Sequence, residues 1–167
     1  MRPNAVWGRI ALLAAALLAG GCDVGPTEAG REAALVGAWG STSAEYTRET
    51  PAGPQTVVIV ERWWFESDGR FYYGRHLSTP VGQSLGYLAV REGRWSTYGS
   101  RLNLRVEAES WSAEPDPDLQ PAPVERRTER YGFAFDDGAL RLSAECGPLA
   151  LCADPLPLQR LPVWTPD

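Results

Sequence analysis

The chain has 167 residues with a formal charge of −5 at pH 7, and all 16 of its basic residues are arginine. An acidic chain repels a phosphate backbone, and no basic cluster compensates for this, so binding to nucleic acid is excluded. The length fits one domain that can bury a sizeable hydrophobic core.

The N-terminal segment has the order of a signal peptide. Arg2 and Arg9 precede an apolar run over 10–18, which is about half as long as a membrane-spanning helix. The motif LLAGGC at 17–22 resembles the lipobox of bacterial lipoproteins. This resemblance implies that residues 1–21 are cleaved, that Cys22 carries acyl chains such as palmitate, and that these anchor the protein in the bacterial cell envelope, facing the periplasm or the exterior. The alternative is a soluble secreted protein in which Cys22 is an ordinary residue.

Residues 22–34 are rich in Gly, Glu and Ala without a clear apolar face, which predicts a flexible tether before a folded domain over 35–167. From residue 35 onward, short runs of Val, Tyr, Trp, Phe and Thr alternate with Gly, Pro, Asp and Ser, and no segment keeps a helical period for three turns. Strands are predicted near 37–48, 56–66, 70–78, 85–91, 93–97, 101–111, 125–135, 139–145 and 151–161.

The number of strands depends on Glu92 and Gly93, because the runs on either side of them form either two strands or a single bent one. The second count gives about eight strands. The clean alternation over 101–107 favours antiparallel pairing with one solvated face. Eight such strands close into an up-and-down barrel, which leaves no exposed edge. Residues 113–123, rich in Pro and acidic side chains, are predicted to form a long loop at one rim.

The three cysteines of the chain divide by role. With Cys22 assigned to the lipid, Cys146 and Cys152 form an even pair in an oxidising compartment, and we expect a disulfide between them. The loop that it closes is short, so the expected stabilisation is only ~2 kcal/mol.

Several short motifs resemble the lipocalin-like, or calycin, barrels found among bacterial lipoproteins. They are LVGAW at 35–39, FESDGRF at 65–71, GRW at 93–95, LNL at 102–104 and LQRL at 158–161. The resemblance implies that Trp39 on the first strand closes one end of the barrel and that Arg160 on the last strand packs over it. Pro155 and Pro157 depart from the pattern, because proline cannot donate to a strand ladder.

A barrel of this size either holds one small ligand or is filled by its own side chains. The residues expected to line it are Trp63, Phe65, Tyr73, Tyr87 and Trp95. Two functions follow: a lipid-anchored protein that binds a small hydrophobic ligand, or an envelope interaction module with a solid core and an unknown protein partner. A filled core is the favoured reading of these aromatics, because aromatic residues dominate cores generally.

Catalytic readings find little support in the residues. His76 is the only histidine, which excludes a multi-histidine zinc site, and no nucleophile-elbow motif accompanies it. Asp136 and Asp137 sit at a predicted hairpin turn, where aspartate is favoured by the backbone conformation. The acidic loop lacks the regular ligand spacing of a calcium site. We therefore expect no enzymatic activity, no metal site and no cofactor.

Overall fold

The computed structural model of the protein describes residues 28–145 and 157–162. The signal peptide predicted over 1–21, the lipid site Cys22 and the predicted pair Cys146 and Cys152 lie outside these residues. Within the described part of the chain, no helix has the length and apolarity to cross a membrane.

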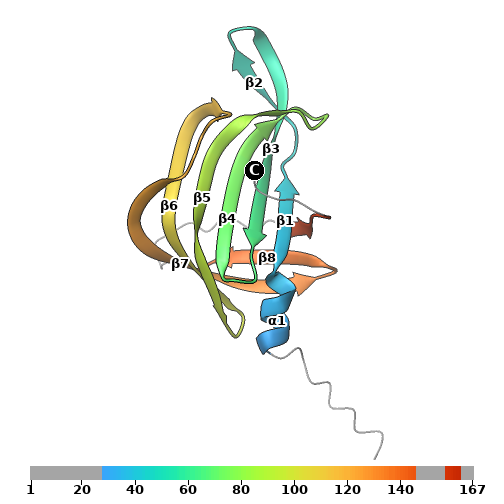
Figure 1. The fold of residues 1–167 in the computed structure, drawn as a ribbon. Helices are drawn as coiled ribbons and strands as arrows, with labels where there is room; N and C mark the ends of the chain where they lie inside the picture. Colours follow the sequence, from blue (N-terminus) through green and yellow to red (C-terminus); the bar gives the residue numbers. More distant parts are fainter. Residues whose placement is uncertain (1–27, 146–156, 163–167) are drawn as a thin grey trace, which may run out of the picture.

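The fold is an antiparallel β-barrel of eight strands with one extra strand and one short helix (Figure 1). In chain order the elements are α1 (Glu28–Leu35), β1 (Gly37–Thr42), β2 (Tyr46–Thr50), β3 (Gly53–Phe65), β4 (Arg70–Ser78), β5 (Ser84–Tyr98), β6 (Arg101–Asp116), β7 (Ala122–Asp136), β8 (Ala139–Ala144) and β9 (Pro157–Arg160). Sequential neighbours pair from β3 to β9, β9 pairs with β1, and β1 pairs back to β3. This last pairing closes the barrel and confirms the predicted fold class.

The strand boundaries differ from the sequence prediction in three places. The runs flanking Glu92 and Gly93 are one strand, β5, with a register shift between these two residues against β6. The first predicted strand is interrupted over 43–45, so β1 and β2 pair with successive parts of β3, and the β2–β3 hairpin extends beyond the barrel (Figure 1). Most of the predicted rim loop is strand, because β6 runs to Asp116 and β7 begins at Ala122.

The tether expected over 22–34 is helical in its last residues, since α1 begins at Glu28. The helix is held by its final residue, because the Leu35 side chain is fully buried in the core. The Trp39 indole donates a hydrogen bond of 2.8 Å to the Leu35 carbonyl, which satisfies one of the carbonyls that a helix end leaves unpaired. The burial of Leu35 in the core therefore stabilises α1, a helix that the sequence pattern of this segment does not predict.

Trp39 and Arg160 lie against each other where the first and last strands pair. They are direct cross-strand neighbours on β1 and β9, and the Arg160 guanidinium carbon lies 5.2 Å from the centre of the indole ring. Arg160 also donates a hydrogen bond of 2.7 Å to the carbonyl of Val36. Pro157 does not prevent closure, because it is the first residue of β9, a position where proline is tolerated.

Replacing Arg160 by alanine is expected to lower the free energy of unfolding by about 1–2 kcal/mol, because the stacking contact and one hydrogen bond are lost. The matched control is Arg141→Ala on β8, whose partner Asp136 forms an exposed ion pair at 2.7 Å. That change should cost less than about 1 kcal/mol. Urea titration of both variants checks this, and equal losses would contradict a closing role for Arg160.

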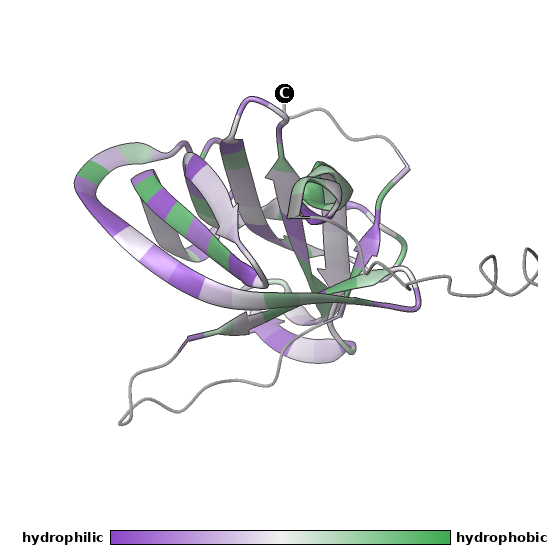
Figure 2. Ribbon diagram, turned by 90° about the horizontal axis from the view of Figure 1, so that it is seen from below, coloured by the Kyte–Doolittle hydropathy of each residue, from purple (hydrophilic) through white to green (hydrophobic). Residues whose placement is uncertain are grey.

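One end of the barrel interior is packed solid with aromatic side chains, which we call the aromatic floor. Its members belong to one buried cluster together with Leu35: Trp39, Trp63, Phe65, Phe71, Tyr73, Trp95 and Phe133. The cluster also contains aliphatic side chains, among them Leu102, Leu104 and Val106 on β6, which are all fully buried. Along the strands, these apolar residues alternate with polar ones, which appear as green and purple stripes in Figure 2. The core thus lies inside the barrel, next to α1.

Candidate functional site

Charged side chains share the inner face of the barrel with this core. On β7, Glu129 lies directly opposite the buried Leu104, and Arg127 lies opposite the buried Val106. On β5, Arg91 lies opposite the buried Tyr73. Because side chains directly opposite each other on paired strands point to the same face, these three residues point into the barrel.

Two arginines and two glutamates form one closed network, which we call the charged quartet: Arg91, Glu109, Arg127 and Glu129. Arg127 binds both oxygens of Glu109, at 2.6 Å each, and its Nε donates to Glu129 Oε1 at 3.0 Å. Arg91 donates to Glu129 through Nη2, and its Nε lies 3.6 Å from Glu109 Oε2. The Tyr131 hydroxyl donates to Glu129 Oε2 at 2.9 Å. The ring of contacts balances two positive charges with two negative ones.

The charged quartet is more buried than an ordinary surface ion pair, so water screens its charges less. The Arg91 side chain is only 8% exposed, and that of Glu109 is 15% exposed. Burial is the largest single influence on the pKa of Glu129 and raises it, but the hydrogen bond and charge of Arg91, together with the hydrogen bonds from Tyr131 and Arg127, outweigh burial, and the net pKa is lowered. The hydrogen bond from Arg127 is the main cause of the lowered pKa of Glu109. Both carboxylates are therefore ionised at neutral pH, and the quartet stays charged.

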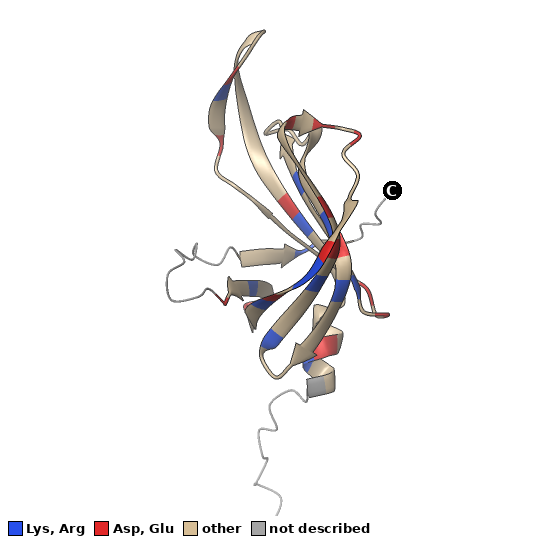
Figure 3. Ribbon diagram, turned by 90° about the vertical axis from the view of Figure 1, so that its left-hand side faces the viewer, with Lys and Arg blue, Asp and Glu red and all other residues tan. Residues whose placement is uncertain are grey.

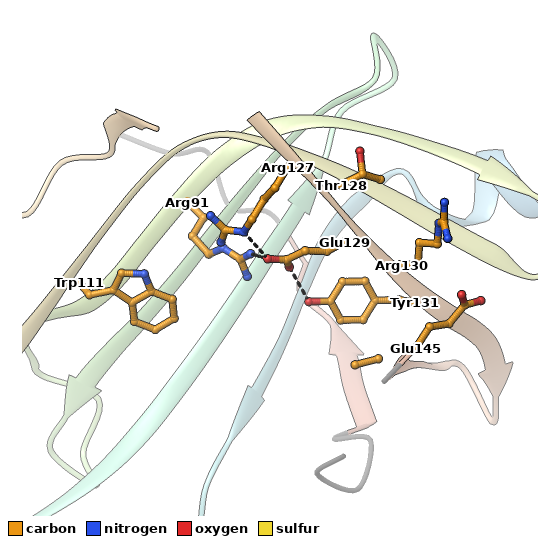
Figure 4. A pocket seen from close by; sticks show the side chains of 9 residues that line it. Arg91, Trp111, Arg127, Thr128, Glu129, Arg130, Tyr131 and Glu145 are labelled. Carbon is orange, nitrogen blue, oxygen red and sulfur yellow. Dashed lines mark hydrogen bonds and ion pairs between the residues drawn. The ribbon is translucent and has the colours of Figure 1, made fainter. Parts of the chain in front are cut away.

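A cleft of about 760 Å³ opens beside the quartet (Figure 4), and we call it the charged cleft. It is lined by Arg91, Trp111, Arg127, Thr128, Glu129, Arg130, Tyr131, Ala144 and Glu145. Trp111 is 60% exposed. Figure 3, which looks onto this side of the barrel, shows acidic and basic residues close together along the strands. The cleft therefore combines a large aromatic surface with donors and acceptors fixed by the barrel, which are the components of a small-molecule site.

Comparison of the chain with protein-family models, with curated proteins and with solved structures finds no match. The fold therefore rests on the observed barrel, and the site rests on its own geometry.

Of the five aromatic residues expected either to line a ligand site or to fill the core, four lie in the packed core, and Tyr87 is the exception. Trp63 contacts Tyr73 at 4.5 Å and Phe65 at 6.1 Å between ring centres, and Phe65 contacts Trp95 at 5.7 Å. Tyr87 lies apart from these, with its ring 5.7 Å from that of His76. None of the five predicted residues borders the cavities of about 760, 770 and 240 Å³ found among the described residues.

Sequence reasoning missed the charged quartet, although β7 carries a signal for it. Arg127, Glu129, Tyr131 and Phe133 are spaced by two and therefore share a face. Phe133 belongs to the buried cluster, so its face is the inner one. When the residues that share a face with a core aromatic include charged side chains, the sequence indicates that this part of the barrel interior is polar.

His76 occupies a second place of interest, on a groove of about 770 Å³ that Arg62, Ser78 and Gln159 also line. The residue is only 6% exposed, and its Nδ1 is buried without a hydrogen-bond partner among the described residues. Burial, together with the charge of Arg62, lowers the pKa of His76 to about 4. The imidazole is therefore neutral at physiological pH.

The buried His76 predicts a loss of stability on mild acidification. As the pH falls below the ordinary value of 6.5, the unfolded chain binds a proton that the folded chain accepts only near pH 4. The free energy of unfolding should therefore fall by on the order of 2 kcal/mol across this window. Urea titrations at pH 7.5 and 4.5 check this against His76→Gln, in which this contribution is absent. Identical pH dependence in the two proteins would contradict the burial of an uncharged imidazole.

The acidic residues considered for catalysis have structural explanations. Asp137 has a φ of 50° at the turn between β7 and β8, a conformation that aspartate tolerates, and Asp136 pairs with Arg141. No group of three or more His, Cys, Asp or Glu gathers to hold a metal ion within 28–145 and 157–162.

Proposed function

We propose that the chain is a lipid-anchored protein of the bacterial cell envelope whose lipocalin-like barrel binds a small polar molecule in the charged cleft without transforming it. The motifs shared with lipocalin-like lipoproteins support the family. The lipobox at 17–22 supports the anchor. The observation that carries the proposal is the division of the interior into a solid aromatic floor and a charged wall that opens on a cleft of about 760 Å³.

This division disfavours the hydrophobic ligand expected from the sequence. A fatty chain needs an apolar cavity, whereas Trp63, Phe65 and Trp95 occupy the apolar part of the barrel and pack against each other. The charged cleft offers guanidinium and carboxylate groups instead. Their hydrogen-bonding directions are fixed by strands, which favours specific recognition of polar groups.

A second candidate is an envelope interaction module in which the barrel only displays a surface to a protein partner. The solid aromatic floor also fits this function. Tyr98 and Trp111 are 75% and 60% exposed, and exposed aromatic residues are enriched in protein interfaces. The two candidates differ in whether a small molecule binds to the isolated protein.

The binding test uses the full chain in detergent and calorimetric titration with a carboxylate, an amine, a sugar and palmitate, each compared with a detergent blank. We expect binding of at least one polar class, and we expect Trp111→Ala to weaken it about tenfold. Tyr98→Ala, which removes an exposed aromatic residue that does not border the cleft, should leave it unchanged. Binding of palmitate alone, unaffected by Trp111→Ala, would contradict the proposed site, and a silent panel would favour the interaction module.

The anchor has its own test in bacteria grown with labelled palmitate. The wild-type protein should take up the label and fractionate with membranes, and Cys22→Ser should do neither, because the thiol that accepts the lipid is absent. Equal labelling of the two proteins would contradict the lipid anchor.

A further inference from the structure

We infer that the charged cleft selects an organic anion, a molecule that combines a carboxylate with a flat apolar group. This inference rests on the proposed function and specifies its ligand class. It follows from three properties of the cleft: a buried hydrogen-bond donor without an acceptor, an arginine without an ion pair, and an exposed indole.

The donors of the quartet exceed its acceptors. Both oxygens of Glu109 accept from Arg127, and both oxygens of Glu129 accept from the quartet's arginines or from Tyr131. Arg91 Nε, by contrast, is buried and has no hydrogen-bond acceptor among the described residues. A buried donor without an acceptor costs free energy. An incoming acceptor therefore gains more here than an incoming donor, which would have to share carboxylate oxygens that already accept from the quartet or from Tyr131.

The charges along the lining have the same bias. Arg91, Arg127 and Arg130 border the cleft together with two glutamates. One of these, Glu145, is already bound at 2.8 Å to Arg101, which lies outside the lining. The Arg130 side chain is exposed, and none of the ion pairs found between described residues includes it. Because Arg130 directly follows the inward-facing Glu129 and lies opposite Asn103, it borders the cleft from the outer face of β7. Because Glu109 and Glu129 balance Arg91 and Arg127, the positive excess at the cleft is the single charge of Arg130. On a chain whose overall charge is −5, this charge would attract a small anion.

Carboxylate is the anion that this geometry suits, because guanidinium groups bind it through paired hydrogen bonds. The flat group is indicated by Trp111, whose indole is 60% exposed on the lining of the cleft. An aromatic or other planar ring would bury part of that indole. The volume of about 760 Å³ lies within the ~300–1,000 Å³ range of small-molecule sites.

The test uses two probes of nearly the same shape, 2-naphthoate and 2-naphthamide, titrated by calorimetry into the full chain in detergent. The amide lacks the negative charge and carries an NH2 donor in place of one acceptor oxygen. We expect the acid to bind at least about tenfold more tightly than the amide. Arg130→Gln should weaken the acid several-fold and leave the amide unchanged. The matched variant is Arg105→Gln, which removes the same charge from an arginine on the same outer face of the barrel. Arg105 pairs with Glu107 and does not border the cleft.

Equal affinities for acid and amide would overturn the inference, as would an equal loss in Arg105→Gln and Arg130→Gln, or no binding of the acid. The proposed function fails separately. If the amide, an amine or a sugar binds in place of the acid and Trp111→Ala weakens it, the cleft is still a binding site and only the anion preference is wrong. If none of these compounds binds, both statements are wrong.

Discussion

Replacing Arg91 by methionine is expected to lower the free energy of unfolding by about 3 kcal/mol or more, because it leaves the glutamates of the charged quartet partly uncompensated inside the barrel. The Arg91 side chain is only 8% exposed, and it contacts both Glu109 and Glu129. Adding Glu129→Gln should restore part of the loss, since one of the uncompensated charges is then removed. A double-mutant cycle on Arg91 and Glu129 should give a coupling of about 1–3 kcal/mol, measured by urea unfolding.

The control cycle uses Arg105 and Glu107, an arginine–glutamate pair at 2.6 Å whose side chains are 49% and 33% exposed. Water screens this outer pair, so its coupling should stay below about 1 kcal/mol. Equal couplings for the two pairs would show that water screens the quartet as it screens a surface ion pair. This result would contradict the conclusion that the quartet is buried in the barrel interior.

Gly93→Ala is expected to cost about 3 kcal/mol or more, or to prevent folding. A Cβ atom at this position would lie 2.0 Å from the Arg105 carbonyl oxygen and 3.0 Å from the Phe71 ring. Neither can move easily, because the first is backbone of the paired strand and the second is fully buried. The substitution would disturb the register shift that bends β5 against β6.

Gly132→Ala is the matched control, since Gly132 also lies in a barrel strand and the nearest atom to its Cβ would be a carbonyl oxygen at 3.9 Å. This variant should fold with a free energy of unfolding within about 0.5 kcal/mol of the wild type. Circular dichroism and urea titration of both proteins check the pair. Equal stability of the two variants would contradict the close strand approach at Gly93.

The barrel was predictable because its strands carry local signals. The alternation over 101–107 and the aspartate–glycine turns indicate antiparallel hairpins, and the structure confirms the barrel that these predict. The position of α1 was not predictable, because Leu35 is held by core contacts that no local pattern encodes.

The candidate site was less predictable than the fold. The aromatic residues proposed to line a ligand cavity are inward-facing in four cases, but period-two spacing shows only which face a residue occupies and not whether space is left there. The quartet depends on contacts between β5, β6 and β7, such as Arg91 with Glu129, which are separated by 38 positions in the chain. Such pairs arise from strand register, which a single sequence does not fix.

The most direct test of the central claim is the indole region of a ¹⁵N–¹H correlation spectrum of the full chain, recorded while 2-naphthoate is added. The seven tryptophans of the chain report on different places. We predict a shift of the Trp111 signal at the charged cleft, with the signals of Trp39, Trp63 and Trp95 in the aromatic floor unchanged. Shifts of the floor signals with Trp111 unmoved would place the ligand in the apolar interior and contradict the account.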